Sequence, residues 1–242
     1  MRSHYEGELW GLATHPTRQE FVTVGNDCVL GIWDIKTRKQ KRFGKLEQAA
    51  NVIAFSNSGV MLAIGYNNGA FHVLEPDNKF TLKANIKNRK EAISDMKFNP
   101  QDTLLAVAAH DSCIILYDVA NNFARLKVMR GHHSTVAHID FSMDGVTLMS
   151  NCTSYEILFF DTQTGKNLPS GASAFRNEPW ATWTCTLGWP VQGIWPPFAN
   201  GTDINAVDRA PDGIVLATAD DFGKVKLFKY PNPVEKAGNQ AY

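Results

Sequence analysis

The sequence lacks the features that mark several common classes of protein. It has no run of about 18 consecutive apolar residues, which is close to the length needed to cross a bilayer. Its first residues, MRSHYEGELW, lack the apolar segment of a secretory signal. Its net charge is zero, because 24 basic residues balance 24 acidic residues, whereas nucleic-acid and anionic-membrane binders usually carry a basic excess. We therefore expect a cytoplasmic protein with no membrane or nucleic-acid partner.

Cysteine is scarce, and its spacing predicts neither a disulfide framework nor a zinc motif. The four cysteines contain no C-x-x-C pair, and we expect them to be free, mostly buried thiols: Cys28, Cys113, Cys152 and Cys185.

Motifs of catalysis are also missing. The sequence contains no Gly-rich phosphate-binding loop and no nucleophile elbow. His132-His133 with His138 could suggest a metal, but His138 and Asp140 alternate along a predicted strand, and His132 fits a structural role described below. We therefore expect no enzymatic activity, no metal and no cofactor.

What the sequence does contain is a repeat. An apolar strand, a turn, a strand of small residues, a polar tight turn and a strand ending in an aromatic residue and Asp recur, with variations, at 9–35, 51–76, 93–119, 136–162 and 203–230. The anchors of the third strand lie 41, 43, 43 and 68 residues apart: Trp33, Leu74, Tyr117, Phe160 and Phe228. A period of about 40–45 residues is typical of a Trp-Asp-type propeller blade, and the long last interval indicates an insertion.

The predicted fold is therefore all-β, a WD-repeat β-propeller of about five units with a Trp-rich hairpin insertion. We place the units at about 4–43, 44–84, 85–130, 131–165 and 201–230, the insertion at 166–200, and a tail or linker at 231–242. An isolated antiparallel sheet cannot bury both faces, but sheets stacked around an axis can. Five units do not obviously close a ring, so we expect an incomplete propeller or a fragment.

A hydrogen-bond network is expected to hold the first unit together. Trp-Asp repeats place a His before the blade, a Ser or Thr on the second strand, an Asp in the tight turn and a Trp on the third strand. The chain resembles them at His4, Thr23, Asp27 and Trp33, and in part at Asp111, Tyr117, His132 and Ser150. A catalytic interpretation of these residues is much weaker than a structural one, because buried polar groups usually satisfy each other.

The insertion contains four of the six tryptophans: Trp180, Trp183, Trp189 and Trp195. Residues 183–187 and 191–195 are predicted to form two short strands joined at Gly188-Trp189-Pro190. This aromatic cluster is either a partner-binding surface or the packed core of a hairpin that covers the propeller.

Two basic clusters are the other candidates for partner binding. They lie near predicted connections between blades, on one face, and comprise Lys36, Arg38, Lys39, Lys41, Arg42 and Lys45, then Lys83, Lys87, Arg89 and Lys90. A basic patch would steer an acidic partner. The alternative is a solvated edge strand on which lysines oppose aggregation.

Longer segments resemble a particular family. GELWGLATHP (7–16), EPWATWTCTLGWPVQGIWP (178–196), GTDINAVDRAPDG (201–213) and LATADDFGKVKLFKYP (216–231) are similar to the echinoderm microtubule-associated protein-like family. The resemblance spans residues 4–231 and is to the second propeller of that family's tandem module. It implies binding to tubulin and microtubules, with cytoskeletal or axonemal partners and a cytoplasmic or ciliary location. We do not identify the hydrophobic motif or the N-terminal coiled coil of that family in these 242 residues, and we therefore expect an incomplete module.

The predicted function is thus non-catalytic binding of microtubules through a propeller face. The alternative is a general interaction scaffold that does not contact tubulin, because fold alone does not fix function. We also expect an adjoining propeller segment or another chain to complete the ring, since an open propeller exposes sheet edges.

Overall fold

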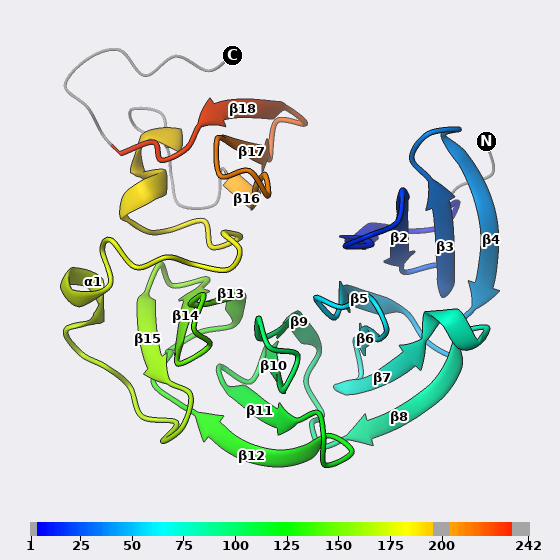
Figure 1. The fold of residues 1–242 in the computed structure, drawn as a ribbon, viewed down its shortest axis with the longest axis horizontal. Coiled ribbons are helices and arrows are strands. Elements are labelled where there is room, and N and C mark those ends of the chain that lie inside the picture. Colours follow the sequence, from blue (N-terminus) through cyan, green and yellow to red (C-terminus); the bar gives the residue numbers. More distant parts are fainter. Residues whose placement is uncertain (1–3, 196–203, 234–242) are drawn as a thin grey trace.

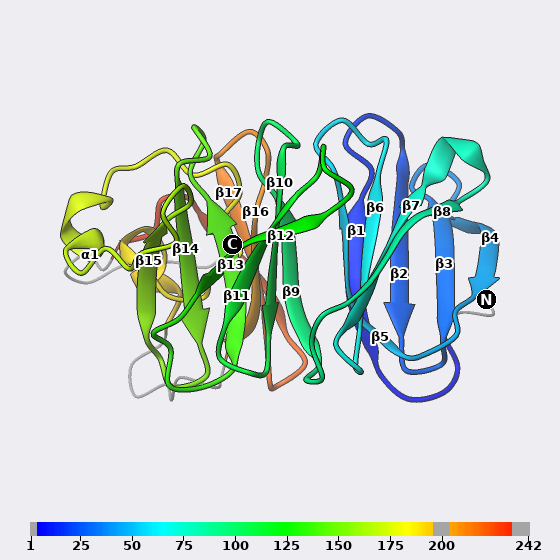
Figure 2. The same ribbon diagram turned by 90° about the horizontal axis from the view of Figure 1, so that it is seen from below.

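The computed structural model describes residues 4–195 and 204–233, which form five antiparallel sheets arranged side by side in an arc. Figure 1 shows the first strand of each sheet on the inside of the arc, and the first and last sheets on either side of an opening. Figure 2 shows the sheets from the side, with their strands running between the two faces of the arc. The prediction of an all-β propeller is confirmed.

The first three sheets have four strands each, paired in chain order. Sheet 1 contains β1–β4 (Leu9–Thr14, Glu20–Gly25, Val29–Asp34, Lys39–Lys45). Sheet 2 contains β5–β8 (Ala50–Phe55, Leu62–Tyr66, Ala70–Glu75, Thr81–Lys87), with a short 3₁₀ helix η1 (Pro76–Asn78) before β8. Sheet 3 contains β9–β12 (Ile93–Phe98, Leu104–Ala109, Ile114–Asp118, Ala124–Met129).

The last two sheets have three strands each in the part of the chain that the structure describes. Sheet 4 contains β13–β15 (Val136–Phe141, Thr147–Cys152, Ile157–Asp161), and sheet 5 contains β16–β18 (Ile204–Arg209, Val215–Asp220, Val225–Lys229). Between them lie a four-residue helix α1 (Gly171–Ala174) and a 3₁₀ helix η2 (Trp189–Ile194). None of the described helices has the length and apolar character needed to span a bilayer.

The hydrophobic core is divided among the spaces between neighbouring sheets. One cluster joins sheets 1 and 2, a second joins sheets 2 and 3, and a third joins sheets 3 and 4. Small residues let the sheets approach closely near the axis. A Cβ added to Gly65 on β6 would lie 2.8 Å from a methyl group of Ile93, on β9 of the neighbouring sheet. Sheet-on-sheet packing is therefore what fixes the arc.

The segment between β15 and β16 contradicts the predicted hairpin. Residues 189–194 form η2 instead of a second strand. The backbone N–H groups of Thr184 and Cys185 donate to Oδ2 of Asp140, at 2.7 and 2.9 Å, so they are not available to a hairpin partner. Figure 1 shows this segment in yellow between sheets 4 and 5. It bridges them, because Ala181 N–H donates to the Phe141 carbonyl and Arg209 N–H donates to the Trp183 carbonyl.

Candidate functional site

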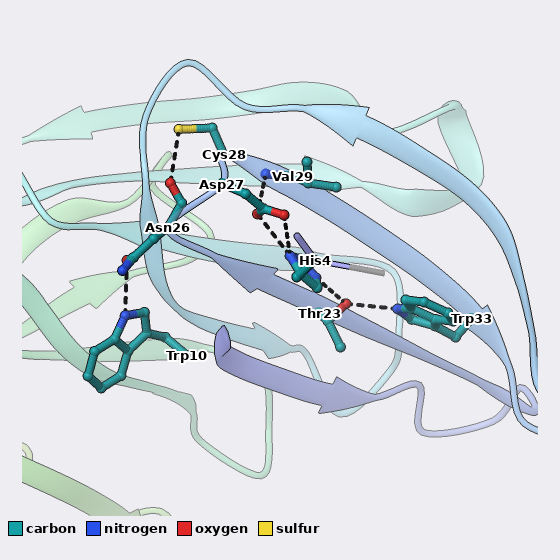
Figure 3. Close-up of polar contacts among 8 residues, drawn as sticks. All are labelled: His4, Trp10, Thr23, Asn26, Asp27, Cys28, Val29 and Trp33. Atoms are coloured by element: carbon teal, nitrogen blue, oxygen red, sulfur yellow. Dashed lines mark hydrogen bonds and ion pairs between the residues drawn. The ribbon is translucent and has the colours of Figure 1, made fainter. Parts of the chain in front are cut away.

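The polar network of sheet 1 is complete. Figure 3 shows His4 between the tight turn and the second strand. Its Nδ1 lies 2.8 Å from Oδ1 of Asp27, and its Nε2 lies 2.8 Å from Oγ1 of Thr23. The indole N–H of Trp33 donates to the same hydroxyl at 2.8 Å. Because the polar side-chain groups of these four residues are hydrogen-bonded to one another, the network ties the segment before β1 to β2 and β3.

Sheet 3 uses a different residue for the same connection. Arg89 was predicted to belong to a basic surface, but its side chain is only 2% exposed. Its guanidinium lies 3.3 Å from Oδ1 of Asp111 and donates to the Cys113 carbonyl at 2.9 Å. Arg89 lies four residues before β9, as His132 lies four residues before β13. That spacing is the sequence signal that could have identified Arg89 as a structural residue. Tyr117 packs edge-on against Phe71 nearby.

Burial affects the electrostatics of these connections. Desolvation lowers the pKa of Arg89, and Asp111 opposes that shift. Desolvation likewise lowers the pKa of His132, while Glu156 opposes it. His132 keeps one expected contact, 2.6 Å from its Nε2 to Oγ of Ser150.

The remaining basic residues are exposed but do not all lie at connections between blades. Residues 39–45 form β4, the outermost strand of sheet 1, and β8 is the outermost strand of sheet 2. A seven-residue strand spans about 20 Å, so Lys39 and Lys45 lie at opposite ends of the sheet. Lys36 and Arg38 precede β4 and lie at the same end of the sheet as Lys39. Of the first cluster, Lys45 therefore lies at the connection from β4 to β5, whereas the others lie on the outermost strand β4 or in the turn before it.

Several of these cations already have intramolecular partners. Lys41 lies 2.7 Å from a carboxylate oxygen of Glu20 and 3.0 Å from one of Asp34, and both hydrogen bonds raise the pKa of its amine. Lys83 pairs with Glu75 at 3.1 Å. Within residues 4–195 and 204–233, no ion pair is formed by Lys36, Arg38, Lys39, Lys45, Lys87 or Lys90. Arg42 packs over the Phe80 ring at 5.5 Å.

The tryptophans of the insertion divide into two pairs. Trp180 and Trp183 are 3% and 2% exposed and pack edge-on in the core between sheets 4 and 5. Trp189 and Trp195 are half-buried. Trp189 stacks under the Arg176 guanidinium at 4.5 Å and borders a hollow of about 700 Å³. The second pair is therefore more exposed than the first, although Trp180 and Trp183 line the same hollow as Trp189.

The free face of sheet 1 is apolar. Leu9, Trp10, Leu12 and Ile35 are each between 42% and 60% exposed. Leu9, Leu12 and Ile35 line a hollow of about 520 Å³ on the side of sheet 1 away from sheet 2, together with Trp33. A monomeric protein rarely exposes a large contiguous apolar patch without a binding role.

Comparison with known proteins identifies the family. Residues 9–242 match the family described as the echinoderm microtubule-associated protein second β-propeller. This chain belongs to that family. It is 42% identical over 234 residues to echinoderm microtubule-associated protein-like 2 of Rattus norvegicus, and 39% identical over 236 residues to the 77 kDa echinoderm microtubule-associated protein of Lytechinus variegatus. It is 37% identical over 238 residues to echinoderm microtubule-associated protein-like 1 of Homo sapiens.

The family assignment covers nearly all of this chain but only part of each relative. The three alignments include 96–97% of this chain and 36%, 35% and 29% of the respective relatives. The chain therefore spans about a third of the length of the curated relatives that it matches.

Proposed function

We propose that this propeller segment binds microtubules without catalysis, as a rigid scaffold within the cytoplasmic microtubule cytoskeleton, axonemal microtubules included. The observation that carries the proposal is membership of a family whose relatives are named microtubule-associated proteins. The exposed cations support it, because an acidic surface such as that of tubulin would attract them.

The cations best placed for one partner are Lys45, Lys87 and Lys90, which we call the Lys45–Lys90 patch. Lys45 ends β4, Lys87 ends β8 and Lys90 follows in the connection to β9. In antiparallel sheets ordered along the chain, the ends of fourth strands lie on the same face. All three side chains are exposed and form no ion pair among the described residues, so their charge is available to a partner.

Co-sedimentation with microtubules tests the proposal. The variant carries Lys45→Gln, Lys87→Gln and Lys90→Gln, and the matched control carries Arg125→Gln, Lys127→Gln and Lys229→Gln, three exposed cations on β12 and β18. At about 0.2–1 kcal/mol per exposed contact, loss of three contacts should make the patch variant bind about 3- to 150-fold more weakly. The control should bind as the unmodified chain does.

Two results would count against the proposal. If the unmodified chain does not co-sediment at low salt, direct microtubule binding by this segment is wrong. If the patch variant and the control variant are weakened by the same factor, binding depends only on net charge, and the Lys45–Lys90 patch is a solvated edge with no specific role. A scaffold that does not contact tubulin is the alternative, and a pull-down dominated by another protein complex would favour it.

We also propose that further propeller blades, from an adjoining segment, cover the free face of sheet 1. The support is the exposed apolar set on that face and a second one on sheet 5, where Val225 is 75% exposed and Leu227 is 45% exposed. The relatives are longer than the aligned segment, so they have sequence from which such blades could come. In a longer chain that carries the adjoining sequence, Leu9 and Leu12 should be protected from hydrogen exchange. Unchanged exchange relative to the isolated segment would contradict this.

A further inference from the structure

Sheet 4 carries an altered version of the network that sheet 1 completes. His132 precedes β13 as His4 precedes β1, and Ser150 contacts its Nε2 as Thr23 contacts that of His4. The tight-turn aspartate is replaced by Ser154, and so the second ring nitrogen of His132 has no equivalent of Asp27.

That nitrogen is buried without a hydrogen-bond partner. The His132 side chain is 1% exposed, and its Nδ1 has no hydrogen bond within the part of the chain that the structure describes. The nearest carboxylate oxygen, Oε2 of Glu156, is 3.5 Å away, which is outside hydrogen-bond range. Such a buried polar atom costs free energy unless something satisfies it.

A thiol completes a donor set around this nitrogen. Cys152 ends β14, at the position where β2 of sheet 1 ends in Gly25. Its Sγ lies 3.2 Å from Oε2 of Glu156. One donor atom each from His132, Cys152 and Glu156 falls within 4.8 Å of the other two.

We propose that His132 Nδ1, Cys152 Sγ and the Glu156 carboxylate bind a zinc ion. Tetrahedral zinc bonds of about 2.0–2.3 Å place ligand atoms about 3.3–3.8 Å apart. Oε2 of Glu156 lies 3.2 Å from Cys152 Sγ and 3.5 Å from His132 Nδ1, close to that spacing. The His132 and Cys152 donor atoms lie within 4.8 Å of each other, so zinc binding would bring them together by at most about 1 Å. Nitrogen, sulfur and carboxylate oxygen together suit Zn²⁺, whereas Mg²⁺ and Ca²⁺ prefer oxygen alone.

Charge and access both favour this ion. On binding, the Cys152 thiol releases its proton to solvent, and one thiolate and one carboxylate then neutralise the two positive charges of Zn²⁺. The backbone N–H of His133 donates to Oε2 of Glu156 at 2.9 Å and orients the carboxylate. The Glu156 side chain is 28% exposed and that of His133 is 82% exposed, so the ion has a route from solvent. The fourth coordination position is left to water or to the His133 ring.

The site would do in sheet 4 what the His4–Asp27 contact does in sheet 1. It would tie the segment before β13 to the β14–β15 turn. The role is structural, and it does not depend on the microtubule function proposed above.

Cobalt substitution tests the site directly. One equivalent of Co²⁺ should give a thiolate-to-cobalt charge-transfer band and the strong visible absorption of a tetrahedral centre, and one equivalent of Zn²⁺ should abolish both. Cys152→Ser should remove the charge-transfer band. Cys28→Ser is the matched control, and the band should persist in it. Cys28 lies in the equivalent turn of sheet 1, where Nδ1 of His4 already contacts the Asp27 carboxylate.

A second measurement guards against loss of folding. Zn²⁺ should raise the melting temperature of the unmodified chain and of Cys28→Ser, but not that of Cys152→Ser, whose far-ultraviolet circular dichroism should match the unmodified chain. The proposal is overturned if Co²⁺ gives no charge-transfer band. It is also overturned if the band survives Cys152→Ser or disappears in Cys28→Ser.

Discussion

Replacing Thr23 with valine should reveal how strongly the sheet 1 network stabilises the fold. Valine keeps the shape of threonine but removes the hydroxyl, which is buried and contacts both His4 Nε2 and Trp33 Nε1 at 2.8 Å. Two buried polar atoms thereby lose the same partner. At about 1–3 kcal/mol for each of the two buried groups left unsatisfied, we expect Thr23→Val to lower the free energy of unfolding by about 2–6 kcal/mol.

Urea unfolding followed by far-ultraviolet circular dichroism measures this loss. Thr81→Val on β8 is the matched control, because Thr81 is exposed and surface changes usually stay within about 0.5 kcal/mol. Trp33→Phe removes the indole donor, so the double variant with Thr23→Val should cost about 1–2 kcal/mol less than the sum of the single variants. A Thr23→Val loss no larger than that of Thr81→Val, or strictly additive costs, would refute the reasoning.

Two further predictions concern the same sheet. A Cβ at Gly31 would lie 2.8 Å from the network's hydroxyl and 2.8 Å from its indole nitrogen, whereas Gly44 on β4 has nothing within 4 Å. Gly31→Ala should therefore lower the midpoint of urea unfolding by an amount equivalent to about 1–3 kcal/mol, and equal effects of Gly31→Ala and Gly44→Ala would contradict this. Hydrogen bonds from the Thr37 backbone and from Lys41 lower the pKa of Asp34 from 3.8 to about 2. The stabilisation from ionised Asp34 is full above pH 3.8 and is lost as the pH falls toward about 2. Asp34→Asn should therefore reduce the slope of unfolding free energy against pH in this acid range. An unchanged slope would exclude the effect.

The repeat made the blade architecture predictable. A spacing of 41–43 residues between third-strand anchors, together with alternating apolar residues and polar turns, indicates stacked antiparallel sheets. The partners in the sheet 1 network could also be predicted, because the chain resembles Trp-Asp repeats at His4, Thr23, Asp27 and Trp33, and the structure contains the hydrogen bond from Trp33 to Thr23.

Other residues could not be placed from local pattern. Arg89 lies in a basic segment of the sequence, yet its side chain is buried, where it pairs with Asp111 in the tight turn of sheet 3. The insertion has the alternation of a hairpin, yet the Asp140 carboxylate takes two of its backbone donors. The decisive partner is Asp111, in the turn between β10 and β11, in the first case and Asp140, on β13, in the second. Each is distant in sequence, and periodicity within a segment carries no information about it.

The sequence by itself determined that this chain is a series of propeller blades and that it resembles one family. Both follow from features repeated or concentrated along the chain, such as the blade period and the Trp-rich segment. The tertiary structure alone decided which cations face solvent and which tryptophans are buried. It also decided that His132, Cys152 and Glu156 converge. The burial of these side chains depends on how neighbouring sheets pack. The convergence of the three residues depends on the replacement of the tight-turn aspartate by Ser154 in sheet 4. In both cases the residues in contact are distant in the sequence.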